Sequence, residues 1–426
     1  MSTLLEAPTR RLQMPRLAVH ACRFCTAPLR LPFVDLGVTP LCQRHVEPAD
    51  YFRMEPTYPL KAYVCQECRL VQLPDHATPA EIFSDYAFFS GFSSTWLQHV
   101  EDYAQAMTGR FGLSPDSFVV EVASNDGTLL KPFQQRGVKV RGIEPAANVA
   151  VAAVAAGVPT TVAFLDRRSA VAFTKKHGQA DLVAANNVLA HTPNLVGFVE
   201  GLKQLLKPAG VLTVEFPHLA NLIRLNQFDT IYHEHWSYFW FTTVRRVFAE
   251  LGLTVFDVQR VSTHGGSLRV FACRSDAAAH PPRQSVREML AEERADGIDD
   301  DTTYTAFAAR VQESKRRLVS LLLELSENGS RVCAYGAPGK GNTLLNYCGI
   351  GPDLVHFTVD RNPQKQGNYL PGSRIPILAP EAIEQYRPDY VLVLPWNLAD
   401  EIMHQLDYVR SWGGRFILPI PEVHIR

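Results

Sequence analysis

The densest group of side chains able to transfer protons is a short run near the middle of the chain. It reads Tyr232-His233-Glu234-His235 and is followed by Trp236. A histidine side chain titrates near neutral pH, and an adjacent glutamate can orient it or shift its pKa. The run therefore predicts an acid/base site. The alternative is a polar loop beside an aromatic core helix, and residue types alone leave both interpretations open.

Two pairs of cysteines form a second chemical pattern in the N-terminal part of the chain. Cys22 and Cys25 are separated by two residues, as are Cys65 and Cys68, and 39 residues lie between the pairs. Four soft thiolates suit a closed tetrahedral zinc site, which leaves no coordination position open for catalysis. We therefore expect a structural zinc ion, with redox-active pairs as the alternative. Cys42, between the pairs, is expected to be a buried thiol.

A loop with a single glycine follows an apolar strand and opens a helix. It reads Glu121-Val122-Ala123-Ser124-Asn125-Asp126-Gly127, and the next strand ends in Glu144. In doubly wound folds this turn is where a ligand meets the helix N-terminus, and an acid at the distance of Glu144 can bind ribose hydroxyls. A pyrophosphate fingerprint has three glycines, and acids repel a pyrophosphate. The cationic S-adenosylmethionine therefore fits better than NAD.

We expect six residues of this region to bind the cofactor: Glu121, Ala123, Asn125, Asp126, Gly127 and Glu144. The alternative is an ordinary strand–helix turn capped by Asn125 or Asp126. Asn186 and Asn187 follow the fourth strand, at the same edge of the sheet, and are expected to join the cofactor site. His191, a few residues later, either lines the site or is a structural histidine.

The elements that must position these residues alternate between apolar strands and amphipathic helices. Strands are expected over residues 118–123, 138–143, 160–164, 180–185 and 211–216, helices from Thr128, from Ala146 and near Arg168, and a turn over 205–210. This alternation predicts a buried, doubly wound parallel sheet. A helix over 304–327 and a strand over 332–335 open a second, smaller unit. The fold class is therefore α/β, with two Rossmann-like domains and a small zinc-binding module.

Length and charge agree with this organisation. At roughly 150 residues per domain, 426 residues predict about three domains. We place a tail at 1–21, the zinc-binding domain at 22–78, the cofactor domain at 79–275 and the C-terminal domain at 276–426. The 42 basic and 43 acidic residues argue against a nucleic-acid partner. The sequence has no apolar run long enough for a membrane span or a signal peptide, so we expect a cytoplasmic protein. We also expect it to be a monomer.

Taken together, the motifs resemble the S-adenosylmethionine-dependent sugar C-methyltransferases, which add a branch methyl at C-3 of dTDP-linked 4-keto deoxysugars for antibiotic glycosides. The resemblance runs from Cys22 to the C-terminus. It is carried by the cysteine pairs and by residues 83–90 (FSDYAFFS), 123–127 (ASNDG), 231–235 (IYHEH), 264–267 (HGGS) and 335–342 (YGAPGKGN).

The resemblance implies a role for each of these segments. Structural zinc is held by the four cysteines, the central domain binds S-adenosylmethionine, and the sugar nucleotide lies between the central and C-terminal domains. The family's base matches His235, and Tyr232, Glu234, Tyr86 and His191 match other active-site groups. His235 would then remove the C-3 proton while a Tyr or His donor holds the enolate oxygen. The carbanion would attack the sulfonium methyl in line.

A second glycine loop follows the strand over 332–335. It is not a Walker A sequence, because Lys340 is followed by glycine, but small residues let a pyrophosphate approach backbone amides. We assign the nucleotide half of the substrate to this loop, with Gly336, Pro338, Lys340 and Asn342, and to Asp360 at the end of the next strand. Trp396 and Asn397, after a later strand, are candidates for contact with the base. His264, in the earlier segment 264–267, either cradles phosphate or shapes the pocket. The alternative is a tight turn that serves packing only.

Three other functions compete with this prediction. An N- or O-methyltransferase acting on a sugar nucleotide is the nearest, because the same cofactor domain would serve it. The Tyr232-to-His235 run favours carbon, since an amine or hydroxyl needs less help to lose its proton. A zinc-knuckled RNA methyltransferase is disfavoured by six basic and six acidic residues over 22–75. A nucleotide-sugar binding protein without activity is disfavoured by the retained acid/base residues.

Overall fold

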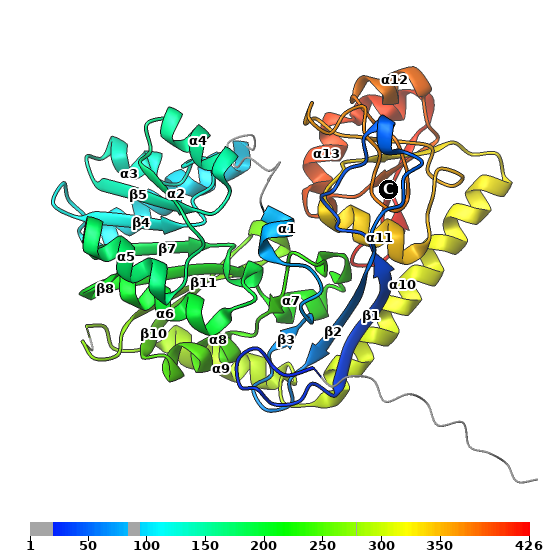
Figure 1. Ribbon diagram of the computed structural model, residues 1–426. Helices are drawn as coiled ribbons and strands as arrows, with labels where there is room; N and C mark the ends of the chain where they lie inside the picture. Colours follow the sequence, from blue (N-terminus) through cyan, green and yellow to red (C-terminus); the bar gives the residue numbers. More distant parts are fainter. Residues whose placement is uncertain (1–19, 84–93, 278) are drawn as a thin grey trace, which may run out of the picture.

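The computed structural model describes residues 20–83, 94–277 and 279–426, which form three β-sheets (Figure 1). A seven-stranded sheet lies in the central domain, drawn in cyan and green, and a six-stranded sheet lies in the C-terminal domain, drawn in orange and red. A four-stranded sheet, built mainly from N-terminal residues, runs beside the long helix α10 (Asp301–Glu327). Within the described ranges, no helix is long and apolar enough to cross a membrane.

The seven-stranded sheet has the strand order β10-β11-β8-β7-β4-β5-β6. Its strands are β4 (Phe118–Val122), β5 (Lys139–Glu144), β6 (Thr160–Val162), β7 (Ala180–Asn186), β8 (Leu206–Pro217), β10 (Leu253–Val261) and β11 (Ser267–Arg274). The strands from β8 to β6 are parallel, whereas β11 pairs antiparallel with both β8 and β10. The predicted doubly wound parallel sheet is therefore confirmed, with an antiparallel pair added at one edge.

Helices cover both faces of this sheet, because its parallel strands are apolar on both sides. One face packs against α2 (Ser94–Phe111), α3 (Lys131–Gln135) and α4 (Ala147–Ala155). The other face packs against α5 (Arg167–His177), α6 (Leu195–Leu205), α8 (Phe241–Glu250) and α9 (Gln284–Ala295). Val286 and Met289 of α9 are buried in this second layer, although the sequence places the domain boundary near residue 275.

Several elements differ by a few residues from their predicted bounds. The sequence predicts a turn over residues 205–210, whereas β8 begins at Leu206, which pairs with Ala180 before a register shift. The helix expected from Thr128 begins at Lys131. It starts late because the Thr128 amide and hydroxyl both bond to Asp126 Oδ1, at 3.2 and 2.6 Å, and hold the preceding turn.

The six-stranded sheet has the order β14-β13-β12-β15-β16-β17 and confirms the predicted second α/β unit. Its strands are β12 (Val332–Tyr335), β13 (Thr358–Val359), β14 (Ile377–Leu378), β15 (Tyr390–Val393), β16 (Arg415–Leu418) and β17 (His424–Ile425). All pairs are parallel except β16–β17. One face packs against α10 and α11 (Gly339–Cys348), and α10 also contacts α7 (Leu219–Arg224). The other face packs against α12 (Glu381–Tyr386) and α13 (Ala399–Gln405).

The four-stranded antiparallel sheet joins the N-terminal module to the rest of the chain. Its order is β1 (Leu31–Thr39), β2 (Tyr58–Val64), β3 (Val71–Gln72) and β9 (Ser237–Tyr238). The strand β9 comes directly after the Tyr232-to-His235 run. On the other side, β1 runs beside α10 (Figure 1). Phe33 of β1 stacks on Phe307 of α10 with ring centroids 4.6 Å apart. The N-terminal sheet thus contacts both larger domains.

The four paired cysteines converge at one end of this sheet. Their sulfur atoms all lie within 4.8 Å of one another, with Cys22–Cys68 at 3.6 Å and Cys25–Cys65 at 3.4 Å. Four sulfurs around zinc at about 2.3 Å lie about 3.8 Å apart, so this cluster fits a tetrahedral zinc ion. Both knuckles close alike: the amides of Thr26 and Arg69, each with a positive φ, donate to the carbonyls of Cys22 and Cys65.

Removing the zinc is expected to destabilise the protein, because comparable sites in zinc-finger peptides contribute about 10–16 kcal/mol of apparent binding free energy. Cys65→Ser should lose the metal and lower Tm by at least ~5 °C, measured by metal analysis and thermal melting. Cys273→Ala, a change at a buried cysteine in the core of the central sheet, should retain one zinc per chain. An unchanged Tm after complete zinc removal would contradict a structural role.

Candidate active site

The cofactor-type loop lies at the carboxyl edge of the central sheet, where the strand order reverses between β4 and β7. Ala123, Asn125 and Asn187 have φ angles of +56°, +49° and +56°. This left-handed conformation is costly for residues other than glycine and is concentrated at functional sites. The buried Glu144 holds the loop in place, because its Oε2 accepts from the Asn125 amide at 2.8 Å and its Oε1 from the Ala146 amide at 2.9 Å.

Gly127 is required here for close packing. Its φ is +78°, and a Cβ at this position would lie 2.8 Å from the Val158 side chain. The glycine therefore permits the approach of the loop to the chain after α4, with the turn closed by the Gly127 amide on the Ser124 carbonyl at 2.9 Å.

Several buried polar atoms at this edge have no hydrogen-bond partner within the described residues. They are Glu121 Oε2, Ser124 Oγ, both amide atoms of Asn186, and Asn187 Oδ1. Burial, together with the carboxylates of Glu144 and Asp126, raises the pKa of Glu121 well above its usual range. Unpaired acceptors and a crowded set of acids fit a ligand that carries N–H and O–H donors and positive charge, which S-adenosylmethionine does.

Three of the predicted catalytic side chains gather beside this edge. The rings of Tyr232 and His235 have centroids 4.0 Å apart, and those of His191 and His235 are 4.6 Å apart. Phe83, at the end of α1 (Pro79–Phe83), packs edge-on against His191 at 5.7 Å. Tyr86, the remaining aromatic residue of the predicted set, lies outside the described residues.

The His235 ring is held in one tautomer by the backbone. Its Nδ1 lies 2.9 Å from the Thr230 carbonyl, which only accepts, so Nδ1 carries the proton and donates it. The Nε2 atom is then the nitrogen with the lone pair. A neutral imidazole in this state can take a proton from a carbon acid.

Glu234 points to a different neighbour. Its Oε1 lies 3.6 Å from Cys42 Sγ, and burial raises the pKa of Glu234 to about 7. Cys42 is buried, as the sequence predicts. His233 also faces away from the His235 ring, because its Nε2 lies 3.2 Å from the Pro59 carbonyl in β2. The group observed to fix the His235 tautomer is therefore a carbonyl rather than the adjacent glutamate.

The second glycine loop lies at the corresponding point of the C-terminal sheet, where the strand order reverses between β12 and β15. Gly336 has a φ of +88°, and a Cβ there would lie 2.6 Å from Pro395, so the loops after β12 and β15 touch. Lys340 Nζ donates to Asn397 Oδ1 and lies 4.1 Å from the centroid of the Trp396 ring. Burial lowers the pKa of Lys340 to about 8.

The other residues predicted for the nucleotide serve the loop in different ways. Asp360 Oδ2 accepts from the Ala337 amide at 2.8 Å, and Asn342 Nδ2 donates to the Cys42 carbonyl at 2.6 Å. Pro338 precedes the first turn of α11, and His264 belongs to a 3₁₀ turn (Thr263–Gly265). The structure thus brings together the side chains of Lys340, Trp396 and Asn397, whereas the side chains of Asp360 and Asn342 bond to backbone groups.

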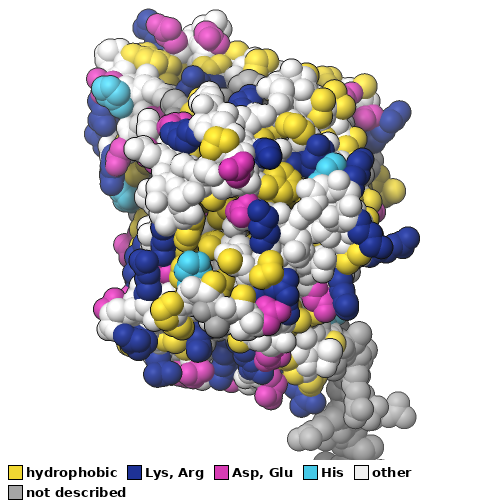
Figure 2. All heavy atoms as spheres, turned by 90° about the vertical axis from the view of Figure 1, so that its left-hand side faces the viewer, with side chains coloured by type: hydrophobic (Ala, Val, Ile, Leu, Met, Phe, Trp, Pro, Cys, Tyr) yellow, Lys and Arg dark blue, Asp and Glu magenta, His cyan; other side chains and the backbone are white. Residues whose placement is uncertain are grey.

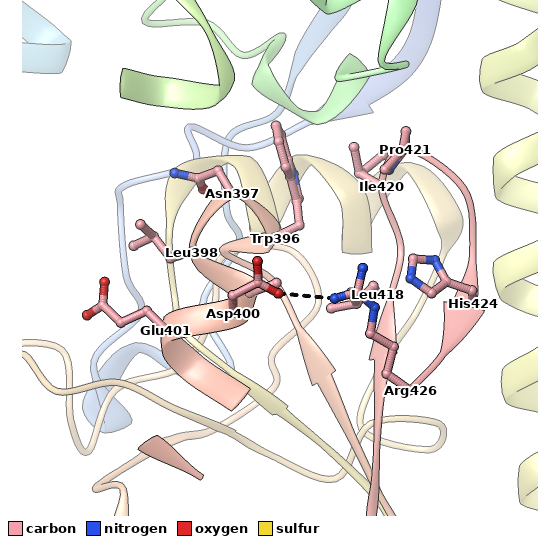
Figure 3. Close-up of a pocket in the computed structure, with 11 residues that line it drawn as sticks. Trp396, Asn397, Leu398, Asp400, Glu401, Leu418, Ile420, Pro421, His424 and Arg426 are labelled. Atoms are coloured by element: carbon pink, nitrogen blue, oxygen red, sulfur yellow. Dashed lines mark hydrogen bonds and ion pairs between the residues drawn. The ribbon is translucent and has the colours of Figure 1, made fainter. Parts of the chain in front are cut away.

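A cavity of about 300 Å³ opens beside Trp396 and Asn397, at the carboxyl ends of β15 and β16 (Figure 3). Leu418 and Ile420 form part of its apolar lining. Arg426 contributes a charged rim and pairs with Asp400 at 3.1 Å.

Sequence reasoning missed Asp229, six residues before His235. Its side chain is fully buried, and its Oδ2 accepts from Trp396 Nε1 at 2.7 Å. Burial raises the pKa of Asp229 to about 6, and the charge of Lys340 opposes that rise. The only local signal is an acid set among apolar residues (Phe228-Asp229-Thr230-Ile231), which periodicity does not distinguish from a surface position.

Comparison with known proteins agrees with this arrangement. Three family models match in order: a zinc binding domain at residues 22–83, a methyltransferase domain at 96–258 and a C-methyltransferase C-terminal domain at 262–421. The chain is also 39% identical to the C-methyltransferase NovU of Streptomyces niveus over 407 residues, covering 96% of this chain and 97% of that protein. The chain belongs to the C-methyltransferase family. The resemblance stated from the sequence is confirmed at this level.

The likeness to solved structures is weaker. Magnesium protoporphyrin IX methyltransferase from Synechocystis PCC 6803 gives a TM-score of 0.33 at 17% identity over 42% of this chain and 79% of that chain. The PH0226 protein of Pyrococcus horikoshii OT3 gives 0.35 at 14% identity over 46% and 97%. The assignment rests on the family models and on the full-length relative.

This C-methyltransferase uses S-adenosylmethionine as its methyl donor and carries a structural zinc site. When bound, the cofactor supplies an electrophilic methyl group. The unpaired acceptors of Glu121, Asn186 and Asn187 are the groups of this chain that fit it.

Stability should depend on pH through Glu234. Its pKa is about 7 in the folded chain against an ordinary 4.5, so between these values the folded state keeps a proton that the unfolded chain releases. Folding is therefore weakened as pH rises through this window, by up to about 3 kcal/mol. Glu234→Gln should raise Tm relative to the wild type at pH 8 but not at pH 5.

Glu324→Gln, at an exposed position of α10, is the matched control and should show no pH-dependent difference in Tm. An equal effect of Glu234→Gln at pH 5 and pH 8 would mean that Glu234 titrates normally.

Proposed function

We propose that this enzyme methylates C-3 of a dTDP-linked 4-keto deoxysugar in the biosynthesis of an antibiotic sugar. The observation that carries the proposal is the position of His235. Its ring lies with His191 and Tyr232 at the cofactor edge, and its Nδ1 is fixed by the Thr230 carbonyl. A histidine whose Nε2 lone pair is available beside a methyl donor suits proton removal from an acidic C–H bond next to a ketone.

In the proposed reaction, His235 Nε2 takes the C-3 proton, and the electron pair of that bond moves toward the ketone. Tyr232, His191 or Tyr86 donates a hydrogen bond to the 4-keto oxygen, where negative charge develops. The C-3 carbon then forms a bond to the methyl group as the methyl–sulfur bond breaks. The fixed orientation of the two reactants supplies much of the rate.

The nucleotide half of the substrate is proposed to lie at the second strand reversal. A pyrophosphate would meet the backbone after Gly336 and the ammonium group of Lys340, which lies on the Trp396 ring. The cavity beside Trp396 and Asn397, whose lining is part apolar and part charged, would take the flat base of the nucleotide (Figure 3). Local positive charge at one loop is sufficient for such a ligand.

Transfer to nitrogen or oxygen of a sugar nucleotide is the nearest alternative, and the C-methyltransferase relatives count against it. An RNA substrate would need a basic surface. On the face of the molecule shown in Figure 2, basic and acidic side chains are interspersed.

The proposal is tested by incubating the enzyme with [methyl-13C]S-adenosylmethionine and a panel of dTDP-4-keto sugars. NMR should show the label bonded to C-3 of one sugar. Label on oxygen or nitrogen would overturn the proposal.

His235→Asn should reduce turnover by at least 10²- to 10⁴-fold, because asparagine cannot accept the proton. Binding of S-adenosylmethionine, measured by calorimetry, should stay within about threefold of the wild type. His404→Asn, on α13 of the C-terminal domain, should leave both quantities unchanged. Normal kinetics of His235→Asn would remove His235 from the mechanism.

A further inference from the structure

The segment from Asp229 to His235 lies between the points where the strand order reverses in the central and C-terminal sheets. Its first residue, Asp229, bonds to Trp396 of the proposed nucleotide site. Asp229 Oδ2 accepts from Trp396 Nε1 at 2.7 Å, and the Trp396 ring lies 4.1 Å from Lys340 Nζ. Asp229 is completely buried, and its Oδ1 has no hydrogen-bond partner within the described residues. A buried carboxylate is retained only where a partner compensates for its desolvation, so the Trp396 bond is costly to lose.

The next residue, Thr230, bonds to the catalytic base, His235. The Thr230 carbonyl accepts from His235 Nδ1 at 2.9 Å, and the Thr230 hydroxyl donates to the Gln227 carbonyl at 2.7 Å. Asp229 and Thr230 are adjacent, and the Thr230 carbonyl belongs to the next peptide along the chain, so a shift of the Asp229 backbone would pass through Thr230 to the carbonyl that orients His235.

Two further contacts attach the same segment to the C-terminal domain. Thr343 of α11 donates to the Ile231 carbonyl at 3.2 Å. Glu234 contacts Cys42, whose carbonyl is held by Asn342 of α11. The base is therefore carried by a loop whose backbone is fixed from the nucleotide side.

We propose that Asp229 is a positioning residue that couples occupation of the nucleotide site to proton abstraction, through Trp396 on one side and the Thr230 carbonyl on the other. The inference rests on the proposed function. A nucleoside diphosphate bound at Lys340 and Trp396 would hold the Trp396 ring in place. The ring would hold Asp229 and, through the backbone, the Thr230 carbonyl. The sugar nucleotide thus helps to align the base that acts on it.

Trp396→Phe tests the coupling, because phenylalanine keeps an aromatic ring beside Lys340 but lacks the indole N–H. The first quantity measured is the Kd for dTDP, by calorimetry. The second is the rate at which the C-3 hydrogen of the sugar exchanges with D2O, at a saturating concentration of dTDP-4-keto sugar and with S-adenosylhomocysteine present. We expect the Kd to change by less than about threefold and the saturated exchange rate to fall at least tenfold. Asp229→Ala should show the same split.

Trp412→Phe is the matched control, because its indole N–H donates to the Pro388 carbonyl away from the strand reversal. It should leave both quantities unchanged. If Trp396→Phe fails to fold, as judged by circular dichroism, Asp229→Ala measured in the same way decides the question, because alanine cannot accept the Trp396 N–H. The double variant Trp396→Phe/Asp229→Ala should lose no more exchange than either single change, since both break one bond.

A normal saturated exchange rate in a folded variant would overturn the coupling and leave the proposed function intact. A wild-type enzyme that neither binds dTDP nor exchanges the C-3 hydrogen would refute the proposed function itself.

Discussion

The hydrogen bond from His235 Nδ1 to the Thr230 carbonyl is the interaction on which the active-site arrangement depends. It determines which imidazole nitrogen carries a proton, and hence which can act as a base. A backbone carbonyl can do this only if the chain that carries it is rigid. That requirement accounts for the contacts that three different parts of the fold make with the segment from Asp229 to Tyr238.

The zinc-binding module supplies part of this rigidity. The strand β9, which follows the base, pairs with β3, and the Leu73 amide bonds to the Trp236 carbonyl at 3.0 Å. His233 contacts the Pro59 carbonyl in the neighbouring strand β2. A small sheet with little core of its own needs a metal to hold its shape, and here that shape supports one side of the catalytic loop.

The sequence predicts what depends on short-range patterns. The two cysteine pairs, the strand–helix alternation and both glycine loops are local, so their positions in the fold follow from spacing and strand polarity. Contacts between distant segments do not follow in this way. The strand β9 has two residues, too few to show a period, and its pairing with β3 depends on the zinc module being in place. In the sequence Asp229 resembles a surface acid, because its hydrogen-bond partner Trp396 lies 167 residues later in the chain.

The central claim is that His235 removes a proton from the sugar carbon that receives the methyl group. A crystal structure with S-adenosylhomocysteine and a dTDP-4-keto sugar tests this most directly. We expect His235 Nε2 within about 3–3.5 Å of C-3, with Nδ1 still on the Thr230 carbonyl and the diphosphate at Lys340. A sugar bound with C-3 away from His235, or a His235 ring turned off the Thr230 carbonyl, would contradict the account.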